Sequence, residues 1–173
     1  AFSPNGDAYV TDQGNDRISV WAANGAFRFG FGKHGTGDGD FRDPFDLSIG
    51  DGEVYVSDWS NHRIQVFDMQ GKFLRKWGSY GSSTGQFQNP FATALAFENG
   101  TVSEVFVTDY NRHRVQVFDK NGSFLRTFGT AGKGVNQFYY PTGIAFGPDS
   151  LLYVANLHGQ RIKVLDRNGT EVR

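Results

Sequence analysis

The side chains that could do chemistry in this chain gather in short polar segments between its apolar runs. His62, His113 and His158 lie in three such segments, and imidazole is a common metal ligand and proton carrier. His62 and His113 occupy equivalent positions in successive repeats of the sequence. Equivalent positions on successive repeats point outward and lie far apart, so the imidazoles are not expected to converge. The sequence therefore predicts no metal site.

Aromatic, amide and basic residues accompany these histidines and indicate binding. Unlike the framework around them, these positions differ from one repeat to the next. Exposed Trp, Tyr, Arg and His side chains on a rigid rim are typical of binding hot spots. We predict a partner-binding surface centred on Trp59 and Tyr110. Its candidate residues are Trp59, Asn61, His62, Tyr110, Arg112, His113 and His158.

The sequence lacks the patterns that common enzyme classes use. It contains no cysteine, which excludes a thiolate nucleophile, a disulfide framework and Cys-ligated zinc. It has no Ser-His-Asp pattern and no phosphate-cradling glycine loop before a helix, so we predict neither catalysis nor a cofactor. The net charge of −1 gives no overall attraction to nucleic acid or acidic membranes. No apolar run approaches the roughly 18–20 residues that span a bilayer, and we expect no membrane insertion.

The elements that must position these side chains recur with a constant length. Asp and Pro stand 32 positions apart in the stretches 12–44, 58–90 and 109–141, and a fourth copy begins at Pro141. Within each stretch an aromatic residue and a glycine recur together, as in Phe31-Gly32, Trp77-Gly78 and Phe128-Gly129. A repeat of about 40–50 residues built from short strands is typical of propeller blades.

Each repeat is predicted to hold short strands and no helix. Polar and apolar residues alternate over 63–67 with the period of a strand. Tight turns with positive φ are expected at Gly25, Gly71, Gly122 and Gly169, between the third and outermost strands. The predicted innermost strands are 45–49, 91–97 and 142–146, and the second strands are 8–11, 54–57, 105–108 and 152–155. The third strands are 17–21, 63–67, 114–118 and 161–165, and the outermost strands are 26–31, 72–77 and 123–128.

The segments 57–68 (SDWSNHRIQVFD), 71–78 (GKFLRKWG) and 85–90 (GQFQNP) closely resemble the NHL repeat. The resemblance covers essentially the whole chain and implies an all-β fold, a β-propeller of four-stranded blades used mainly as a rigid binding platform. We expect a propeller segment over residues 1–173, a single arc of about four NHL-type blades with incomplete terminal blades. The blade units are approximately 1–43, 44–89, 90–140 and 141–173. The family also includes RNA-binding repressors, extracellular sensor domains and a related amidating lyase.

An Asp and an Arg five positions apart frame the turn between the second and third strands. We expect partly buried, bidentate pairs between Asp12 and Arg17, Asp58 and Arg63, and Asp109 and Arg114. Their recurrence in every repeat indicates a structural role. Asn156 stands at the Asp position of the fourth repeat, so Arg161 should lack an ionic partner and leave a weaker turn.

Three further departures from the repeat give separate expectations. Glu171 replaces the aromatic residue of the outermost strand, which makes a fourth outermost strand doubtful. The spacing between Pro90 and Asp109 is 19, against 14 and 15 in the neighbouring repeats, and predicts a longer loop around 98–103. The glycine-rich stretch 32–39 is interpreted as a flexible turn.

We interpret the chain as a non-enzymatic interaction or structural scaffold that binds a protein or glycan partner through its variable loop face. Open strand edges in the terminal blades also predict self-association. The alternative is single-stranded RNA binding through the same face, since such surfaces combine stacking aromatics with positive charge. Asp16, Asp38 and Asp40 dilute that charge, so nucleic acid is the less favoured partner.

Three sequons, at Asn99, Asn121 and Asn168, are expected in turns on the opposite face. Glycans on that face would leave the variable rim unobstructed. We therefore expect an extracellular or secreted glycoprotein, with a cytoplasmic protein as the alternative.

Overall fold

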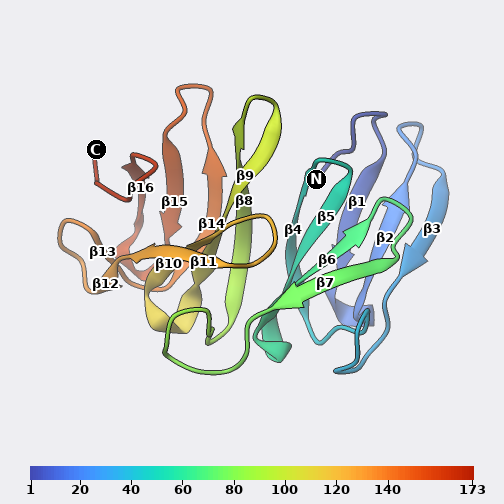
Figure 1. Cartoon of the computed structure of the whole chain (residues 1–173), viewed down its shortest axis with the longest axis horizontal. Coiled ribbons are helices and arrows are strands. Elements are labelled where there is room, and N and C mark those ends of the chain that lie inside the picture. Colours follow the sequence, from blue (N-terminus) through green and yellow to red (C-terminus); the bar gives the residue numbers. More distant parts are fainter.

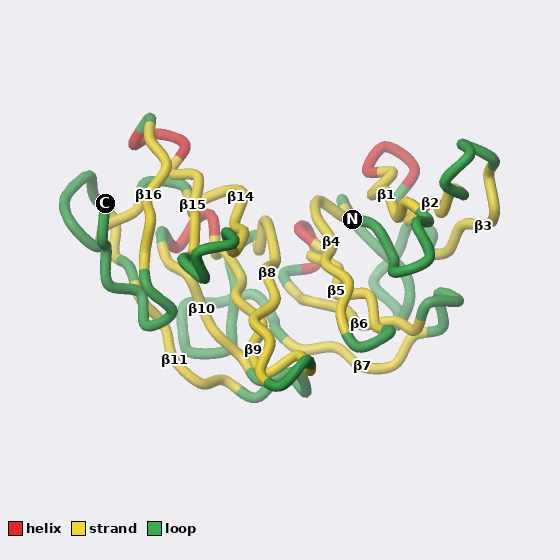
Figure 2. Tube along the Cα trace, turned by 90° about the horizontal axis from the view of Figure 1, so that it is seen from above, coloured by secondary structure: helices red, strands yellow, loops and turns green.

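The computed structural model describes residues 1–173 as four antiparallel sheets arranged as an arc (Figure 1). Seen from above, β14, β8 and β4 lie toward the inner side of the arc and β11 and β7 toward the outer side (Figure 2). The first sheet contains β1 (Ala8–Asp12), β2 (Arg17–Trp21) and β3 (Phe27–Phe31). The second contains β4 (Pro44–Gly50), β5 (Glu53–Asp58), β6 (Arg63–Asp68) and β7 (Phe73–Trp77). The third contains β8 (Pro90–Glu98), β9 (Thr101–Asp109), β10 (Arg114–Phe118) and β11 (Phe124–Phe128), and the fourth β14 (Pro141–Phe146), β15 (Leu152–Asn156) and β16 (Arg161–Leu165).

These sheets confirm the predicted all-β propeller class. Each is a meander in sequence order, with three strands in the first and last sheets and four in the two between. The end sheets carry one additional isolated bridge each, Phe2 to Ala8 and Leu165 to Glu171. A short parallel pair, β12 (Thr130–Ala131) and β13 (Gln137–Phe138), closes the loop that leads into the fourth blade. No helix of this structure is long and apolar enough to cross a bilayer.

The extra residues of the third repeat lengthen a hairpin, and the prediction of a longer loop was wrong. Glu98 pairs directly with Thr101, so that β8 and β9 have nine residues each and only Asn99-Gly100 remains as the turn. The strand continues through 101–105, with Val102 and Val105 both buried. A bulge between Ala96 and Phe97 absorbs the change of register.

The hydrophobic core lies between adjacent blades. One cluster joins Ile18 and Val20 of the first blade to Val54 and Val56 of the second, and the next two blade interfaces hold similar clusters. A phenylalanine from each linking loop completes each cluster, and all three are fully buried: Phe41, Phe87 and Phe138. Burying such a ring contributes about 1.5–3 kcal/mol. Strand residues of neighbouring blades therefore form most of each interface, and each linking loop adds one buried ring.

Glycine is required where these rings approach the chain. Gly78 has a φ of +99°, and a Cβ placed there would lie 2.7 Å from the Phe87 ring. The predicted turn glycines Gly25, Gly71, Gly122 and Gly169 also have positive φ, between 81° and 91°. The glycine that follows the repeat aromatic residue and the buried phenylalanine of the linking loop therefore belong to one packing unit.

The fourth blade ends differently from the others. Glu171 forms only an isolated bridge to Leu165, in agreement with the doubt about a fourth outermost strand. Its carboxylate pairs instead with Lys163, whose side chain is fully buried. The Lys163 ammonium lies 5.9 Å from the centroid of the Phe138 ring. Burial of this ammonium depends on Glu171, which explains why an acidic residue stands at an aromatic position.

Candidate functional site

The turns between the second and third strands all have the same backbone conformation. Each is a single 3₁₀ turn: η1 (Gln13–Asn15), η2 (Trp59–Asn61), η3 (Tyr110–Arg112) and η4 (Leu157–Gly159). The following residue has a left-handed conformation in every case, with φ of 51° at Asp16, 55° at His62, 56° at His113 and 53° at Gln160. Each turn joins the second strand of its sheet to the third, and every sheet has the same strand order. All four turns therefore lie at the same end of their sheets, which we call the loop face.

The Asp and Arg pairs form as expected, but their geometry is not bidentate. Arg63 Nε donates to Asp58 Oδ2 over 2.7 Å, and Arg114 Nε donates to Asp109 Oδ2 over 2.9 Å. The terminal nitrogens of Arg63 instead donate to the carbonyls of Thr36, Gly37 and Asp40 in the preceding loop. One guanidinium therefore fastens its own turn to the loop from the blade before it.

The same arrangement shows that the glycine-rich stretch 32–39 is a clamped loop, contrary to the expected flexible turn. Arg63 holds three of the carbonyls in this region, and Gly39 N–H donates to Gln65 Oε1 over 3.0 Å. Arg114 binds the corresponding carbonyls of Ser82, Ser83 and Gln86. The loops on this face are fixed in place by the blade that follows them.

The exposed fraction of these pairs varies between blades. The Asp58 and Arg63 side chains are 0% and 7% exposed, whereas those of Asp12 and Arg17 are 25% and 46% exposed. In the fourth blade Arg161 has no carboxylate partner, as expected, and donates to the Lys133 and Gly134 carbonyls. The Nδ2 of Asn156 is buried without a hydrogen bond.

Two of the predicted binding residues, His62 and His113, accept a hydrogen bond from a backbone amide of the linking loop. Asn89 N–H donates to His62 Nδ1 over 3.2 Å, and Tyr140 N–H donates to His113 Nδ1 over 3.1 Å. Asp16 Oδ1 accepts the equivalent bond from Asp43 N–H over 2.7 Å. Because an amide can only donate, both histidines must be neutral at Nδ1. Burial lowers the pKa of both imidazoles, and the charge of nearby His158 further lowers that of His113.

The remaining candidates are distributed along the loop face. Asn61 Nδ2 donates to Asp58 and to the Gly35 carbonyl, so its side chain belongs to the clamp. Arg112 is half-buried and forms no ion pair, and its Nε has no hydrogen-bond partner. His158 is exposed in η4. A partner-binding role for these residues stays a prediction.

The structure brings Trp59 and Tyr110 together, with ring centroids 5.1 Å apart. Both rings are half-buried. Trp59 also packs on Phe45 at 4.8 Å and on Phe91 at 5.5 Å. On its other side, Tyr110 packs on Tyr140 at 4.7 Å.

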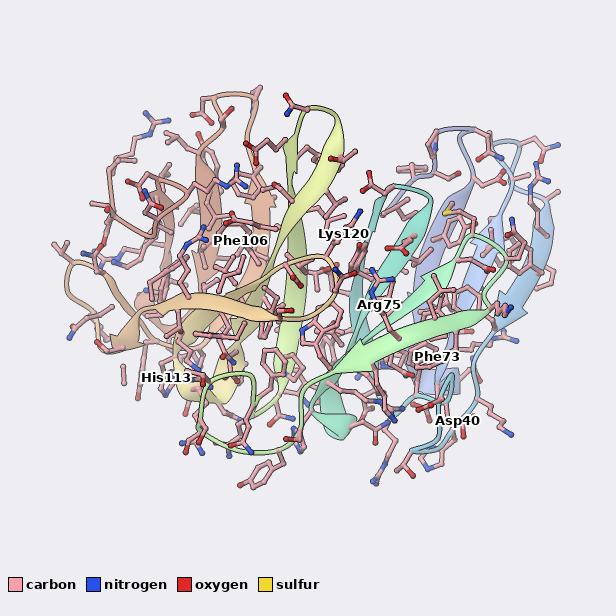
Figure 3. The ribbon with its side chains drawn as sticks, viewed as in Figure 1. Asp40, Phe73, Arg75, Phe106, His113 and Lys120 are labelled. Carbon is pink, nitrogen blue, oxygen red and sulfur yellow. The ribbon has the colours of Figure 1, made fainter.

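The row continues into the fourth blade. Tyr140 lies 4.6 Å from His113 and 4.7 Å from His158, measured between ring centroids. The two imidazoles therefore contact the same tyrosine ring; His113 is labelled in Figure 3. Tyr139 contacts the same imidazoles. We call this row the aromatic ridge, and its members are Phe45, Trp59, Phe91, Tyr110, His113, Tyr139, Tyr140 and His158.

Sequence reasoning missed Phe45, Phe91, Tyr139 and Tyr140. Phe45 and Phe91 directly follow the repeat prolines and were assigned to innermost strands. Tyr140 precedes a repeat proline, at the position that Asp43 and Asn89 occupy in other blades. The signal that could have found it is this change from a small polar residue to an aromatic one.

Tyr140 has an unusual backbone conformation, with a φ of +59°. Asp43 and Asn89 have φ of +56° and +69° at the equivalent positions, but Asp and Asn tolerate left-handed backbone better than a bulky residue does. Backbone strain of this kind costs about 1–3 kcal/mol and is concentrated at functional sites. The fourth blade thus bears a conformational cost to place this ring in the ridge.

Metal ligation has no support in this geometry. No group of three or more His, Asp or Glu side chains lies close enough together to hold a metal ion. His113 and His158 both pack against Tyr140 without a third ligand, and His113 Nδ1 already accepts an amide hydrogen bond. The loop face is thus built from aromatic rings, clamped loops and an unpaired guanidinium.

The match to a known family begins at the end of one of these loops and includes the Asp58 and Arg63 pair. Residues 41–67, from the buried Phe41 through Asp58, η2 and Arg63 to Phe67, match the family model of the NHL repeat. The chain carries an NHL repeat. This match confirms the resemblance inferred from the second repeat.

Known proteins are similar to parts of this chain in sequence or share its fold. "Protein brain tumor" of Drosophila melanogaster is 33% identical over 73 residues, which is 41% of this chain and 7% of that protein. A streptogramin B lyase structure matches with a TM-score of 0.74 and 17% identity over 99% of this chain and 51% of that chain. A catalytically inactive virginiamycin B lyase from Staphylococcus aureus with quinupristin matches with a TM-score of 0.73 and 17% identity, over 99% of this chain and 53% of that one. This chain thus spans about half of each lyase and a small part of the fly protein, and at these identities the lyases show the fold alone.

Proposed function

We propose that the loop face is a non-enzymatic binding platform for a protein partner, centred on the aromatic ridge. The observation that carries this proposal is the continuous contact of the ridge across three blades, completed by Tyr140 in a left-handed conformation. Packing between blades alone does not require that ring, because the equivalent Asp43 and Asn89 serve the other interfaces.

The chemistry of the ridge suits protein recognition. Trp, Tyr and Arg are the residue types most enriched in binding hot spots. Tyr139 is 36% exposed and His158 is also exposed, so the ridge is accessible at its fourth-blade end. Arg112, in the same turn as Tyr110, has no ion pair of its own and is available to a partner carboxylate. The clamped loops keep these groups ordered before binding, which lowers the entropic cost of association.

Affinity enrichment from the source organism tests this function. We expect a protein that the native chain retains to be lost by Tyr110→Ser and retained by Tyr80→Ser. Tyr80 is a matched control because it is 62% exposed and lies outside the ridge, in contact with His62. Circular dichroism checks that both variants fold. Equal retention by the native chain and Tyr110→Ser would contradict a role for the ridge.

Single-stranded RNA is the second candidate partner. The stacked rings beside an unpaired Arg112 favour it, because bases stack on aromatic side chains and phosphates pair with guanidinium. The net charge of −1 and the presence of Asp16 and Asp43 on the same face count against it. Filter binding over a salt series separates the two functions. Salt-dependent retention that Arg112→Gln weakens would support RNA, and no retention would remove it.

A secreted glycoprotein remains our proposal for the setting of this platform. Asn99, Asn121 and Asn168 are exposed, and none of their side-chain amides forms a hydrogen bond within the chain. The turns at Asn99 and Asn121 join strands at the end of the sheets opposite the loop face, and the turn at Asn168 follows β16 at the same end. Glycans there would leave the aromatic ridge uncovered, which supports the division into a modified face and a binding face.

A further inference from the structure

Asn-Gly sequences recur through the chain, at residues 5–6, 24–25, 99–100, 121–122 and 168–169. Such a sequence allows an asparagine to modify itself, because glycine has no side chain to hinder attack by its backbone nitrogen. The glycine nitrogen forms a bond to the Asn Cγ, and its proton leaves with the side-chain NH₂ group as ammonia. Water then opens the resulting succinimide ring to aspartate or isoaspartate.

This reaction needs a glycine nitrogen that is free to turn toward the asparagine side chain. A backbone N–H that donates a hydrogen bond keeps its proton and is directed at its acceptor, so the bond must break before the nitrogen can attack. The hydrogen bonds of the glycine N–H groups should therefore rank the Asn-Gly sites of the folded chain by their rates.

Four of the five glycine N–H groups donate to the carbonyl three residues earlier. The bonds run over 2.8–3.1 Å, from Gly6 to Ser3, Gly25 to Ala22, Gly122 to Asp119 and Gly169 to Asp166. At these four sites the attacking nitrogen is held within its own turn.

Aspartate side chains hold two of these turns further. Asp119 Oδ1 accepts from the N–H groups of Asn121 and Ser123 over 2.9 and 2.8 Å. Asp166 forms the same two bonds in the turn that contains Asn168. The Asn and Gly residues of both turns are thus fixed on each side of the bond that would have to form.

The turn between β8 and β9 is different. Asn99 and Gly100 form the whole connection between Glu98 and Thr101, which pair directly at the tip of the hairpin (Figure 1). A turn of this kind closes through its flanking residues, so the N–H of its second central residue has no partner. Gly100 N–H accordingly donates no hydrogen bond within the chain.

The surroundings of this turn leave room for the reaction. Asn99 and Gly100 are both exposed, and the side-chain amide of Asn99 forms no hydrogen bond within the chain. A Cβ placed at Gly100 would have no other heavy atom within 4 Å beyond its chain neighbours. At Gly122, by contrast, a Cβ would lie 2.7 Å from the Trp77 ring.

We propose that Asn99 is a site of self-modification, at which a succinimide formed with Gly100 opens to aspartate and isoaspartate. The reaction places a carboxylate at the tip of the β8–β9 hairpin, where Asp51 of the second blade already accepts from Val102 N–H over 2.8 Å. Isoaspartate also adds one backbone atom to a turn of only two residues. The modified hairpin therefore gains negative charge and loses its tight turn.

This reaction and glycosylation exclude each other at Asn99. Deamidation removes the side-chain amide that the sequon at 99–101 requires. A glycan on that amide would in turn prevent its loss as ammonia. The unglycosylated recombinant chain is consequently the material in which the reaction is measured.

Incubation of this chain at mildly alkaline pH, followed by peptide mapping with mass spectrometry, tests the proposal. We expect aspartate and isoaspartate to form at residue 99 about 2–10-fold faster than at Asn121 or Asn168, the factor set by the one hydrogen bond that those sites must break. In urea that unfolds the chain this difference should disappear, because all the glycine nitrogens are then free.

Two variants make the test specific. Asp119→Ala removes the side-chain acceptor of the 121–122 turn and should bring the rate at Asn121 closer to that at Asn99. Asn99→Gln should abolish the fastest modification and leave the rates at the other sites unchanged. Equal rates at Asn99 and Asn121 in the folded chain would overturn the proposal. A preference for Asn99 that persisted unchanged in urea would also overturn it, since the fold would then have no part in the selectivity.

Discussion

Replacing Asp58 by Asn should destabilise the chain far more than the same change at Asp12. The Asp58 carboxylate is fully buried and accepts from Arg63 Nε, the Arg42 amide, Asn61 Nδ2 and Gln65 Nε2. The substitution removes the charge that compensates a guanidinium only 7% exposed. It also presents an amide group to three side-chain donors that need acceptors.

The magnitude follows from burial. Breaking a buried ion pair by removing one partner costs about 3–5 kcal/mol. The Asp12 and Arg17 side chains are 25% and 46% exposed, and an exposed pair contributes about 0.2–1 kcal/mol. For a chain of this size, each kcal/mol of lost unfolding free energy lowers the melting temperature by about 2–4 °C. Asp58→Asn should therefore lower the melting temperature by about 6–20 °C.

Urea unfolding of the native chain, Asp58→Asn and Asp12→Asn, followed by tryptophan fluorescence, measures both costs. The reverse change, Asn156→Asp, provides a control within the same chain. It should restore an ionic partner for Arg161 and raise the unfolding free energy by up to about 1 kcal/mol, since Arg161 is exposed. If Asp58→Asn cost no more than Asp12→Asn, the view that the clamp depends on its buried charge would be wrong.

Four further predictions concern the whole chain. His62 and His113 have a folded pKa below the value of about 6.5 expected when unfolded, so the unfolded state binds more protons and stability should fall as pH is lowered from about 7 to 5. Replacing both by Asp, as at Asp16, should flatten that part of a urea-unfolding pH profile; an unchanged slope would contradict it. Gly122→Ala should destabilise by about 1–3 kcal/mol more than Gly25→Ala in the same assay, because both have positive φ but only the Gly122 Cβ would meet a ring, that of Trp77 at 2.7 Å. Equal costs would argue against that contact. The intact mass of natively sourced protein should exceed the peptide mass in hexose-containing steps that disappear when Asn99, Asn121 and Asn168 become Gln, and a bare peptide mass would contradict the glycoprotein proposal. Size-exclusion chromatography should show self-association, and a clean monomer at low micromolar concentration would count against it.

The strands and hairpin turns could be predicted from the sequence because each repeat encodes them locally. Alternation over 63–67 and the turn glycines depend only on neighbouring residues, and β6 and the positive φ values agree with them. The longer hairpin of β8 and β9 was missed because loop length was inferred from spacing. Val102 and Val105 are three positions apart and do not show the period of two that marks a strand, and only the bulge at Ala96 and Phe97 places both against the core.

The geometry of the clamp could not be predicted in the same way. Asp58 and Arg63 are five positions apart, so their pairing is a local signal. The other acceptors of Arg63 are carbonyls 23–27 residues earlier, and a backbone carbonyl leaves no mark in the residue type. The ridge had a stronger signal in Tyr140, but its meaning depends on contacts between blades that one repeat does not contain.

The direction of these clamps affects how the chain can be divided. Arg63, Arg114 and Arg161 each hold the loop that precedes their own sheet, so a loop belongs energetically to the blade downstream of it. In repeat proteins, stability is approximately a sum of unit and nearest-neighbour contributions. A chimera joined at Pro90 would separate the 82–86 loop from Arg114, whereas a junction at Gly78 would transfer the loop together with its guanidinium. The exchangeable module of this architecture is therefore offset from the visible sheet by the length of one loop.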